Sequence, residues 1–524
     1  MTRKISRRDF LKLASGTSLF GLGVLASGCA SEQKDEGGDG WMPDQYQGRG
    51  DFPAHLKGRV AISPKNPSIM RDDEKCILCG QCIEACHNVI GVHGYYPLPL
   101  KDETACIGCG QCTMWCPTGA IHERPAVDQV EAALDDDSKF VVVQTAPATK
   151  VSLGEEFGMA PGSIVSGKQV AALRALGFDA VFDTCMSADM TIMEEASEAL
   201  VRLTQKKDVL PHFTSCCPGW VRFCELFYPD LMKHLSTCKS PAAMMGATVK
   251  SYYAEKKGLD PKNIVTVSIM PCTAKKGEAL RKELGHDGLQ DVDYVLTTRE
   301  LALLLKKKGI DFESLDNADY DSILGESTGA GRIFGATGGV AEASVRSLYY
   351  FATHQAPPAN LLEWKAVRGL TSVKEAQASV PGVGTVSVAV VNGMASGRKV
   401  LDAIRAGQGS RWQFIEFMAC PGGCIGGGGQ PKSQFASSED MRQRRIAALY
   451  QEDRGAKKRA SHENAEIQTL YKEFYGQPLS ERAEKYLHTS FVDQSEKIFD
   501  AETQHAPNTP PKAPKAQKVQ TAKA

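Results

Sequence analysis

Two cysteine runs constrain the fold of this chain more than any other feature of its sequence. Eight of its 17 cysteines lie between Cys76 and Cys116, and none lies beyond Cys424. At about 3% of the chain, cysteine is too sparse for a scaffold held together by disulfides. Each run has two residues between its first three cysteines and three residues before its fourth. Such regular spacing indicates that the thiols bind metal.

That spacing is typical of bacterial two-cluster ferredoxins, in which the fourth cysteine of each run ligates the cluster held by the other run. The predicted ligands of one 4Fe–4S cluster are Cys76, Cys79, Cys82 and Cys116. Those of the other are Cys106, Cys109, Cys112 and Cys86. Zinc is the alternative metal, but zinc sites seldom place four cysteines in one such run, let alone in two. Two adjacent clusters carry electrons, so the chemistry must take place elsewhere in the chain.

Residues 1–29 are predicted to be an export signal. Arg7 and Arg8 form a twin-arginine pattern, and the weakly apolar stretch 13–26 that follows is too short to span a bilayer confidently. The signal ends in a lipobox-like segment in which Cys29 would be lipidated. A short basic amphipathic start is the alternative. The twin-arginine route exports folded proteins, so the cysteines could reach the periplasm or the outer face of the cytoplasmic membrane as metal ligands instead of disulfides.

Composition divides the rest of the chain into five predicted parts. They are a polar linker (30–66), an α+β two-cluster ferredoxin-like domain (67–136), an α/β domain (137–435), a charged helical segment (436–495) and a disordered Pro/Lys/Ala-rich tail (496–524). Within the α/β domain we expect strands at 140–145, 265–270 and 386–391, and helices at 188–203 and 299–308. The chain has 61 Lys and Arg residues against 62 Asp and Glu, which excludes a strongly basic nucleic-acid binder.

Three further cysteine motifs lie in the α/β domain, at residues 214–220, 270–278 and 417–424. Cys272 and Cys420 each follow an apolar strand, at the carboxyl end where α/β folds place their sites. Glycines around Cys424 would let the backbone close tightly on a ligand. Four converging thiolates would suit another iron–sulfur cluster. The alternative is a set of buried cysteines with no ligand.

At these motifs the chain resembles the FeFe (iron-only) hydrogenases, from about residue 70 to 490, with the large and small subunits fused in one chain. The resemblance implies an H-cluster, which is a 4Fe–4S cubane joined to a two-iron centre carrying CO, cyanide and a bridging azadithiolate. Its implied ligands are Cys217, Cys272, Cys420 and Cys424, and the family pattern assigns the bridging thiolate to Cys424. The implied fold is an α/β catalytic domain with the ferredoxin-like domain before it and a helical small-subunit segment after it.

The resemblance also assigns residues around the two-iron centre. Lys275 is similar to the lysine that holds one cyanide, and Ala146 and Pro147 resemble the backbone segment beside the other. Met270 and Met418 resemble methionines packed against the two irons, although both would also serve as apolar core residues. Cys185, Ala242 and Gly426 depart from residues common in the family. Cys185, Cys224 and Cys238 are expected to be buried core thiols, with a protective thiol near the cluster as the alternative role for such a residue.

Proton delivery involves a second group of residues. Glu195, Glu198 and Arg202 lie at i, i+3 and i+7, so a helix would place them on one face, where a solvated charged surface is the alternative interpretation. Cys216 is adjacent to a ligand but in this family binds no iron, so its thiol can pass protons to the bridging amine. The route implied by the resemblance is Cys216, Glu195, Ser236 and Glu198, with Arg202 at the exit.

The implied activity is the reaction H2 ⇌ 2H⁺ + 2e⁻, with H2 oxidised at the cell envelope. Electrons would pass through the two 4Fe–4S clusters to a redox partner protein or a membrane electron carrier. H2 evolution is the alternative direction, and a non-catalytic iron–sulfur sensor or scaffold is the alternative class. The complete motifs argue against that class. Residues 441–491 resemble the small subunit and should wrap the catalytic domain as helices, with His462 and His488 packing or hydrogen-bonding. No nucleic-acid partner is expected.

Overall fold

The structure, a computed structural model, describes residues 58–96, 105–432 and 439–498. The predicted signal, Cys29, most of the linker and almost all of the predicted tail lie outside these residues. The described residues all belong to one unit that spans 57–524. None of the helices in this described part is long and apolar enough to cross a membrane.

The first sheet of the α/β domain is parallel throughout. Its strands run in the order β4 (Ala180–Asp183), β3 (Phe140–Thr145), β6 (Ile264–Met270) and β9 (Tyr294–Thr297). Val141 and Val143 of β3 pack in one core cluster and Val142 packs in another. Because both faces of the strand are covered, its sequence is an apolar run and does not alternate with polar residues.

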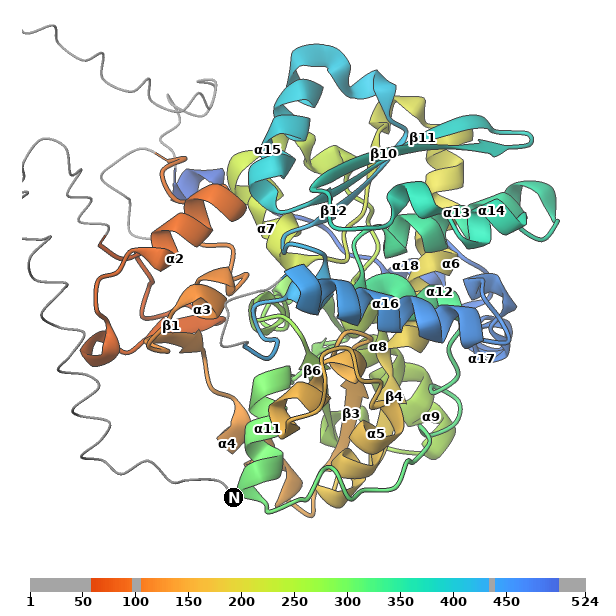
Figure 1. Ribbon diagram of the computed structural model, residues 1–524. Coiled ribbons are helices and arrows are strands. Elements are labelled where there is room, and N and C mark those ends of the chain that lie inside the picture. The colour runs from red at the N-terminus through yellow and green to blue at the C-terminus, as the bar shows by residue number, and fades with distance from the viewer. Residues whose placement is uncertain (1–57, 97–104, 433–438, 499–524) are drawn as a thin grey trace, which may run out of the picture. The chain divides into compact units, whose positions relative to one another are not determined.

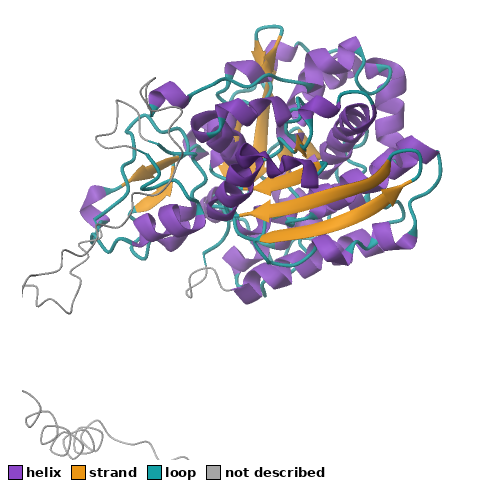
Figure 2. Ribbon diagram, turned by 90° about the horizontal axis from the view of Figure 1, so that it is seen from above, coloured by secondary structure: helices purple, strands orange, loops and turns teal. Residues whose placement is uncertain are grey.

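The second sheet combines a hairpin with parallel strands. Its order is β10 (Val373–Val380), β11 (Gly384–Asn392), β12 (Phe414–Met418) and β5 (His212–Phe213). β10 and β11 pair antiparallel, whereas β11, β12 and β5 are parallel to one another. A short antiparallel pair, β7 (Gly285–His286) and β8 (Leu289–Gln290), lies outside both sheets. Figure 2 shows helices surrounding the strands of this domain.

Helices connect and cover these strands. They are α4 (Val127–Leu134), α5 (Ser166–Ala175), α6 (Thr184–Thr204), α7 (Pro218–Phe227), α8 (Pro241–Thr248), α9 (Ala254–Lys257), α10 (Ala274–Glu278), α11 (Thr298–Lys307), α12 (Gly329–Arg332), α13 (Gly339–Thr353), α14 (Ala359–Leu362) and α15 (Met394–Ala403). In Figure 1, α5 and α11 flank the sheet that contains β3 and β6, and α13 and α15 lie beside the other sheet.

Local sequence signals explain where the helices begin. Asp183 ends β4 and caps α6 by accepting a hydrogen bond from the backbone N–H of Cys185. The helix predicted at 188–203 therefore starts four residues earlier, at Thr184. Thr297 and Glu300 form a capping box that starts α11 one residue before its predicted position. The strand expected at 140–145 has the bounds of β3, and those expected at 265–270 and 386–391 lie within β6 and β11.

The ferredoxin-like segment contains a small antiparallel sheet and two short helices. The strands are β1 (Ile69–Arg71) and β2 (Ile121–Glu123), and the helices are α2 (Gln81–Glu84), which continues as a π-helical turn over Ala85–Val89, and α3 (Gln111–Trp115). Residues 58–66, which composition places in the linker, contact this segment. Gly58 forms a β-bridge with Cys79, and Val60 is buried beside Cys82. The packed structure therefore includes residues before position 67.

The C-terminal segment is helical, as predicted. It contains α16 (Glu439–Gly455), α17 (Ala465–Leu470) and α18 (Glu481–Leu487). Figure 1 shows α16 crossing the front of the α/β domain between its two sheets. Leu449 of α16 is fully buried in a cluster that also contains Ala148, Ile333 and Ile425. The small-subunit-like segment thus packs on the loops that follow strands of the catalytic domain.

Candidate active site

Strand ends bring the predicted ligands together. β3 leads into Ala146, β6 into Cys272 and β12 into Cys420, while β5 leads into Cys216 and Cys217. β3 and β6 are neighbouring parallel strands of one sheet, and β12 and β5 are neighbouring parallel strands of the other. The carboxyl ends of parallel strands are where α/β folds form ligand sites. Both sheets therefore direct their strand ends toward one place.

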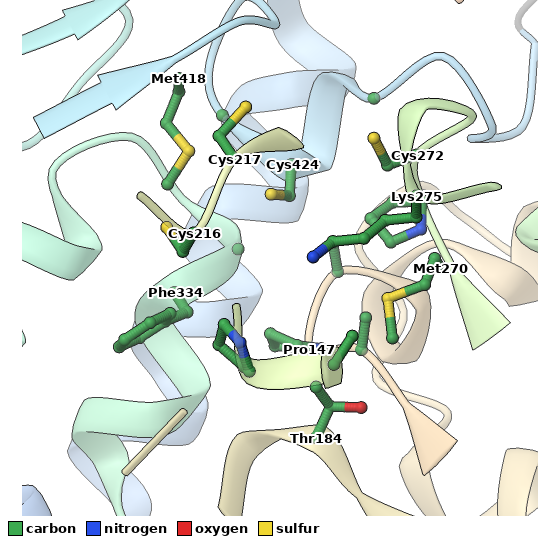
Figure 3. Close-up of a pocket in the computed structure, with 18 of the residues that line it drawn as sticks. Pro147, Thr184, Cys216, Cys217, Met270, Cys272, Lys275, Phe334, Met418 and Cys424 are labelled. Carbon is green, nitrogen blue, oxygen red and sulfur yellow. The ribbon is translucent and has the colours of Figure 1, made fainter. Parts of the chain in front are cut away.

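A cavity lies at that place. The four predicted H-cluster ligands Cys217, Cys272, Cys420 and Cys424 all line it, together with Cys216, Lys275, Ala146, Pro147, Met270 and Met418. Figure 3 shows Cys216, Cys217 and Met418 on one side of the space and Cys272, Lys275 and Met270 on the other. Every residue that the resemblance placed around the cluster thus borders a single space.

The thiols reach this cavity from rigid or tightly turned backbone. Cys217 occupies the N-cap position of α7, whose first residue is Pro218. The positive end of a helix dipole stabilises a thiolate at that place. Cys424 follows Gly423, whose φ of 91° is unfavourable for other residues, and a Cβ at Gly423 would lie 2.6 Å from the backbone N of Thr337. The glycine is required for the close turn that presents Cys424.

Lys275 is the charged side chain among the residues that line the cavity. Its Nζ donates a hydrogen bond of 2.7 Å to Oε2 of Glu278, which also accepts one from Oγ of Ser240. Burial disfavours the ammonium, but the Glu278 carboxylate outweighs that effect and raises the pKa of Lys275. The cavity therefore contains one fixed positive charge. Glu278 was missed in the sequence, although its i+3 spacing from Lys275 on a short helix is a usable signal.

The first ferredoxin-type group of thiols surrounds its own small cavity. Cys76, Cys79, Cys82 and Cys116 all line this space, which is next to Gly58 and Gly80. Three of these cysteines come from the first run and one from the second, as the ferredoxin spacing predicts. Cys79 is exposed, and its neighbours Ile77 and Leu78 are 64% and 55% exposed. This group is therefore close to solvent.

The second group lies between the first group and the large cavity. The thiol of Cys112 interacts electrostatically with those of Cys106, Cys86 and Cys82, and Cys109 interacts with Cys112, Cys86 and Cys106. Cys420 of the large cavity in turn interacts with Cys109. Hydrogen bonds fix this junction: Gln111 Nε2 donates to Gly426 O at 2.8 Å, and Thr273 Oγ1 donates to Gly108 O at 2.6 Å. The loops of Cys272 and Cys424 are thus held against the second cysteine run.

The outer half of the predicted proton route is connected by hydrogen bonds. Ser236 Oγ donates to Glu198 Oε2 at 2.6 Å, and Arg202 donates to Glu198 Oε1 at 2.5 Å. Burial acts to raise the pKa of Glu198, but the charges of His212 and Arg202 and the Ser236 hydrogen bond hold it below its ordinary value. Glu195, Glu198 and Arg202 share one side of α6, as their spacing predicts, and Glu195 and Arg202 are buried.

The inner half of that route is arranged differently. Glu195 interacts electrostatically with Cys216, but neither of its carboxylate oxygens has a hydrogen-bond partner in the described residues. Glu195 also approaches His212, whose Nε2 lies 3.8 Å from Glu195 Oε1. The sequence does not reveal this contact, because the position of His212 four residues before Cys216 gives no signal that its side chain faces Glu195.

The three cysteines expected to be core thiols, and the two histidines expected to pack or hydrogen-bond in the C-terminal segment, behave as expected. Cys185, Cys224 and Cys238 are buried. Cys185 contacts Lys150 Nζ at 3.2 Å and does not line the large cavity, although its neighbour Thr184 does. His462 stacks on Tyr350 with ring centroids 3.9 Å apart. His488 hydrogen-bonds to Thr237 and Glu194.

Family models match three parts of the chain. A model described as "Iron only hydrogenase large subunit, C-terminal domain" matches residues 139–428, and one described as "Iron hydrogenase small subunit" matches residues 439–494. A third, "4Fe-4S binding domain", matches residues 99–122. The first of these covers more than half of the chain, and the three together follow the order ferredoxin-like, catalytic and small-subunit segment.

Individual proteins are similar over most of the chain. The NADP-reducing hydrogenase subunit HndD of Solidesulfovibrio fructosivorans is 46% identical over 81% of this chain and 74% of its own length. The periplasmic [Fe] hydrogenase large subunit of Nitratidesulfovibrio vulgaris is 48% identical over 73% of this chain and 90% of its own. A solved structure of an apo [FeFe]-hydrogenase HydA1 from Chlamydomonas reinhardtii matches with a TM-score of 0.62 and 41% identity, over 70% of this chain and 98% of the other.

Proposed function

Because the chain belongs to the iron-only hydrogenase family and catalyses the interconversion of H2 with protons and electrons, we propose that it oxidises H2 at the cell envelope. The observation that carries the residue assignments is the single cavity bordered by four cysteine thiols, a fifth cysteine and one lysine. The enzyme carries an H-cluster and 4Fe–4S clusters, in keeping with its catalytic and 4Fe–4S domains.

The thiols of the cavity fit the H-cluster by number and by chemistry. Soft thiolate ligands suit iron–sulfur clusters, and Cys217, Cys272, Cys420 and Cys424 would hold the cluster, with Cys424 as the bridging thiolate. When bound, the H-cluster supplies the iron at which H2 is split or formed. The Lys275 ammonium, fixed by Glu278, would bind an anionic cyanide ligand. The rest of the cavity wall would exclude water through its apolar residues Met270, Met418, Ala146 and Pro147.

Protons would leave the cavity through a series of side chains. The Cys216 thiol would exchange a proton with the cluster's amine and then with Glu195. Ser236, Glu198 and Arg202 would carry the proton onward, which their hydrogen bonds support. The charge of Arg202 favours the ionised form of Glu198, so a proton that arrives there is released again toward the surface.

Electrons would leave along the cysteine groups. The closeness of Cys420 to Cys109, and of Cys112 to Cys82, supports a relay from the cavity through the second ferredoxin-type cluster to the first. The exposed position of Cys79 supports transfer to an external acceptor, either a redox partner protein or a membrane electron carrier. H2 evolution is the same path used in reverse.

We infer the cellular location from the N-terminal sequence. The twin-arginine pattern at Arg7 and Arg8 supports export of the folded, cofactor-loaded protein. Cys29 would then attach it to the membrane surface through a lipid. Retention of the protein in the membrane fraction, and its release when Cys29 is replaced by serine, would test this anchor. A wild-type protein that remains entirely in the soluble fraction would contradict it.

Infrared spectroscopy with an activity assay tests the main proposal. Matured enzyme should show bands from bound CO and cyanide and should reduce a dye with H2. A protein with 4Fe–4S clusters but neither bands nor dye reduction would be a scaffold or a sensor. Cys216→Ser should retain the bands and lose roughly 100-fold or more of its turnover, and full turnover in this variant would refute the proton route. Identification of the acceptor reduced under H2 in membrane fractions distinguishes oxidation from evolution.

A further inference from the structure

His212 and Glu195 form a buried polar pair. The proposed mechanism uses Glu195 but gives no role to His212. His212 belongs to β5 and Glu195 to α6, and their side chains are 0% and 1% exposed. The two groups approach to 3.8 Å, between Nε2 of the imidazole and Oε1 of the carboxylate. None of their four polar atoms has a hydrogen-bond partner within the part of the chain that the structure describes. Among the described residues, no other side chain has more than one such buried, unpartnered atom.

This arrangement is unusual because buried polar atoms in proteins almost always have hydrogen-bond partners. Leaving a donor or acceptor unpaired in the interior carries a desolvation penalty. Where such groups persist, a catalytic role is one of the few physical explanations. Here the pair adjoins Cys216, whose thiol interacts with the Glu195 carboxylate. The unpaired atoms therefore lie at Glu195, the step of the proposed proton path at which no hydrogen bond is seen among the described residues.

The imidazole is held in place by its surroundings. Its ring stacks on Phe414 of β12, with centroids 5.3 Å apart and an interplanar angle of 23°. The backbone N–H of His212 donates to Gln413 O at 2.8 Å, and His212 pairs with Phe414 in the parallel register of β5 and β12. The ring is thus fixed by the strand that leads to Cys420. A fixed imidazole can accept a proton at one nitrogen and donate one at the other.

Other ionisable groups surround the pair on several elements. They are Glu198 and Arg202 of α6, Cys216 after β5, and Cys238 after η7 (Pro229–His234). Glu416 of β12 interacts in turn with Cys216. Glu416 accepts hydrogen bonds from the backbone N–H groups of Gly338 and Ala341 at the start of α13, so it is already occupied. Glu198 is occupied by Ser236 and Arg202. His212 is the neighbour of Glu195 that remains available to take its proton.

We propose that His212 is a proton-relay and positioning residue that acts on Glu195, an inference that rests on the proposed hydrogenase function. Nε2 of the neutral imidazole accepts the proton of the Glu195 carboxylic acid, which leaves a carboxylate beside an imidazolium. The reverse transfer returns the proton, and no electrons or other reactants are involved. His212 stores the proton between its arrival from Cys216 and its departure toward Ser236 and Glu198. The imidazolium also holds the carboxylate in position for the next transfer.

His212→Gln and His212→Met test this role, because one retains a polar amide and the other fills the ring's volume with an apolar group. His462→Gln is the matched control, since His462 is also a buried histidine stacked on an aromatic ring but lies against Ser347 and Tyr350, not Glu195. All variants are matured with the H-cluster, and loading is measured by the CO and cyanide bands. Turnover of H2 with a dye is then recorded from pH 5 to 9.

We expect both His212 variants to load normally, to lose about tenfold or more in turnover, and to change the shape of the pH profile. His462→Gln should match the wild-type profile. Wild-type turnover and pH profile in either loaded His212 variant would overturn the proposal. A lower rate with an unchanged pH profile would also overturn it, because that result is expected from a purely structural role.

A second readout does not depend on turnover. The infrared band of the protonated Glu195 carboxyl, assigned with Glu195→Gln, should titrate at a different pH in the His212 variants than in the wild type. An unchanged titration of that band would overturn the proposal even in a variant that loads poorly. The proposed function fails separately, if the wild-type protein itself lacks the CO and cyanide bands or does not turn over H2.

Discussion

The two regions that hold cysteine groups differ most in their relation to solvent. The outer ferredoxin-type group includes the exposed Cys79 and is flanked by Ile77 and Leu78, two of the most exposed large apolar side chains among the described residues. The catalytic cavity is lined mainly by apolar residues, and α16 packs on loops that border it. A cluster that passes electrons to a partner must lie near the surface, whereas a cluster that handles protons and gas requires a controlled route. The chain meets these two requirements at opposite ends of the proposed electron relay.

The largest effect is expected from removing a thiol of the enclosed region. Cys420→Ser should lower H2-dependent dye reduction by more than about 100-fold, because a predicted ligand of the catalytic cluster is lost. Replacing residues that only hydrogen-bond to metal ligands typically costs up to about 100-fold. The infrared bands of CO and cyanide should weaken in parallel. Cys224→Ser is the control, since that buried thiol donates to Tyr228 O and does not line the catalytic cavity. Equal loss of the bands in both variants would contradict the assignment.

Removal of a thiol at the exposed end should separate electron transfer from catalysis. Cys79→Ser should reduce electron delivery to a protein acceptor by about tenfold or more, because the outermost cluster loses a ligand. Exchange between H2 and D⁺ needs no external acceptor and should remain at the wild-type rate. Ile77→Ala, which keeps every thiol, should leave cluster content unchanged. Loss of exchange in Cys79→Ser would show that the two ends are not functionally separate.

The sequence predicts features that depend on local patterns, and it does not predict contacts between residues that are distant in the chain. The ferredoxin-type cysteine groups can be predicted because the spacing of their residues along the chain is itself the signal, and the strand β3 can be predicted because its apolar run is continuous. Residues 58–66 look like a linker because their apolar run, residues 60–62, is only three residues long among Gly, Pro, polar and charged residues. The burial of Val60 beside Cys82 depends on a contact that is distant in sequence. The approach of His212 to Glu195 likewise results from packing a strand against a helix. Side-chain spacing cannot predict such contacts.

Enclosure of the cavity can be tested through the small-subunit-like helix. Leu449 of α16 is fully buried and lies close to Gly335, which lines the cavity. Leu449→Ala should lower the free energy of unfolding by about 2–5 kcal/mol, through lost apolar burial and the space left behind. Denaturant unfolding followed by circular dichroism measures this. Leu303→Ala, at a position that is 59% exposed on α11, should change the stability by no more than about 0.5 kcal/mol. Similar effects of the two substitutions would show that the packing of Leu449 does not hold α16 on the catalytic domain.

The smallest expected effect concerns the outer proton-route residue Glu198. Its pKa is held below the ordinary value, since the charges of His212 and Arg202 and the Ser236 hydrogen bond outweigh the opposing effect of burial. A carboxylate with a depressed folded-state pKa contributes stability that is complete above its ordinary pKa of about 4.3 and is lost as the pH falls through the lower folded-state value. Glu198→Gln should therefore be less stable than the wild type by about 1–3 kcal/mol at pH 7.

That difference should become smaller as the pH falls below the ordinary range of the carboxyl, because the wild-type side chain then becomes neutral, as glutamine is. Unfolding midpoints measured between pH 7 and pH 3.5 follow the trend. The control is Glu375→Gln, which removes an exposed ion pair with Arg411 and should cost less than about 1 kcal/mol. A stability difference for Glu198→Gln that stayed constant or grew toward low pH would mean that the carboxylate charge does not stabilise this site. In that case the charge of Glu198 would not distinguish the proton exit from the catalytic cavity. The two regions would differ only in their access to solvent.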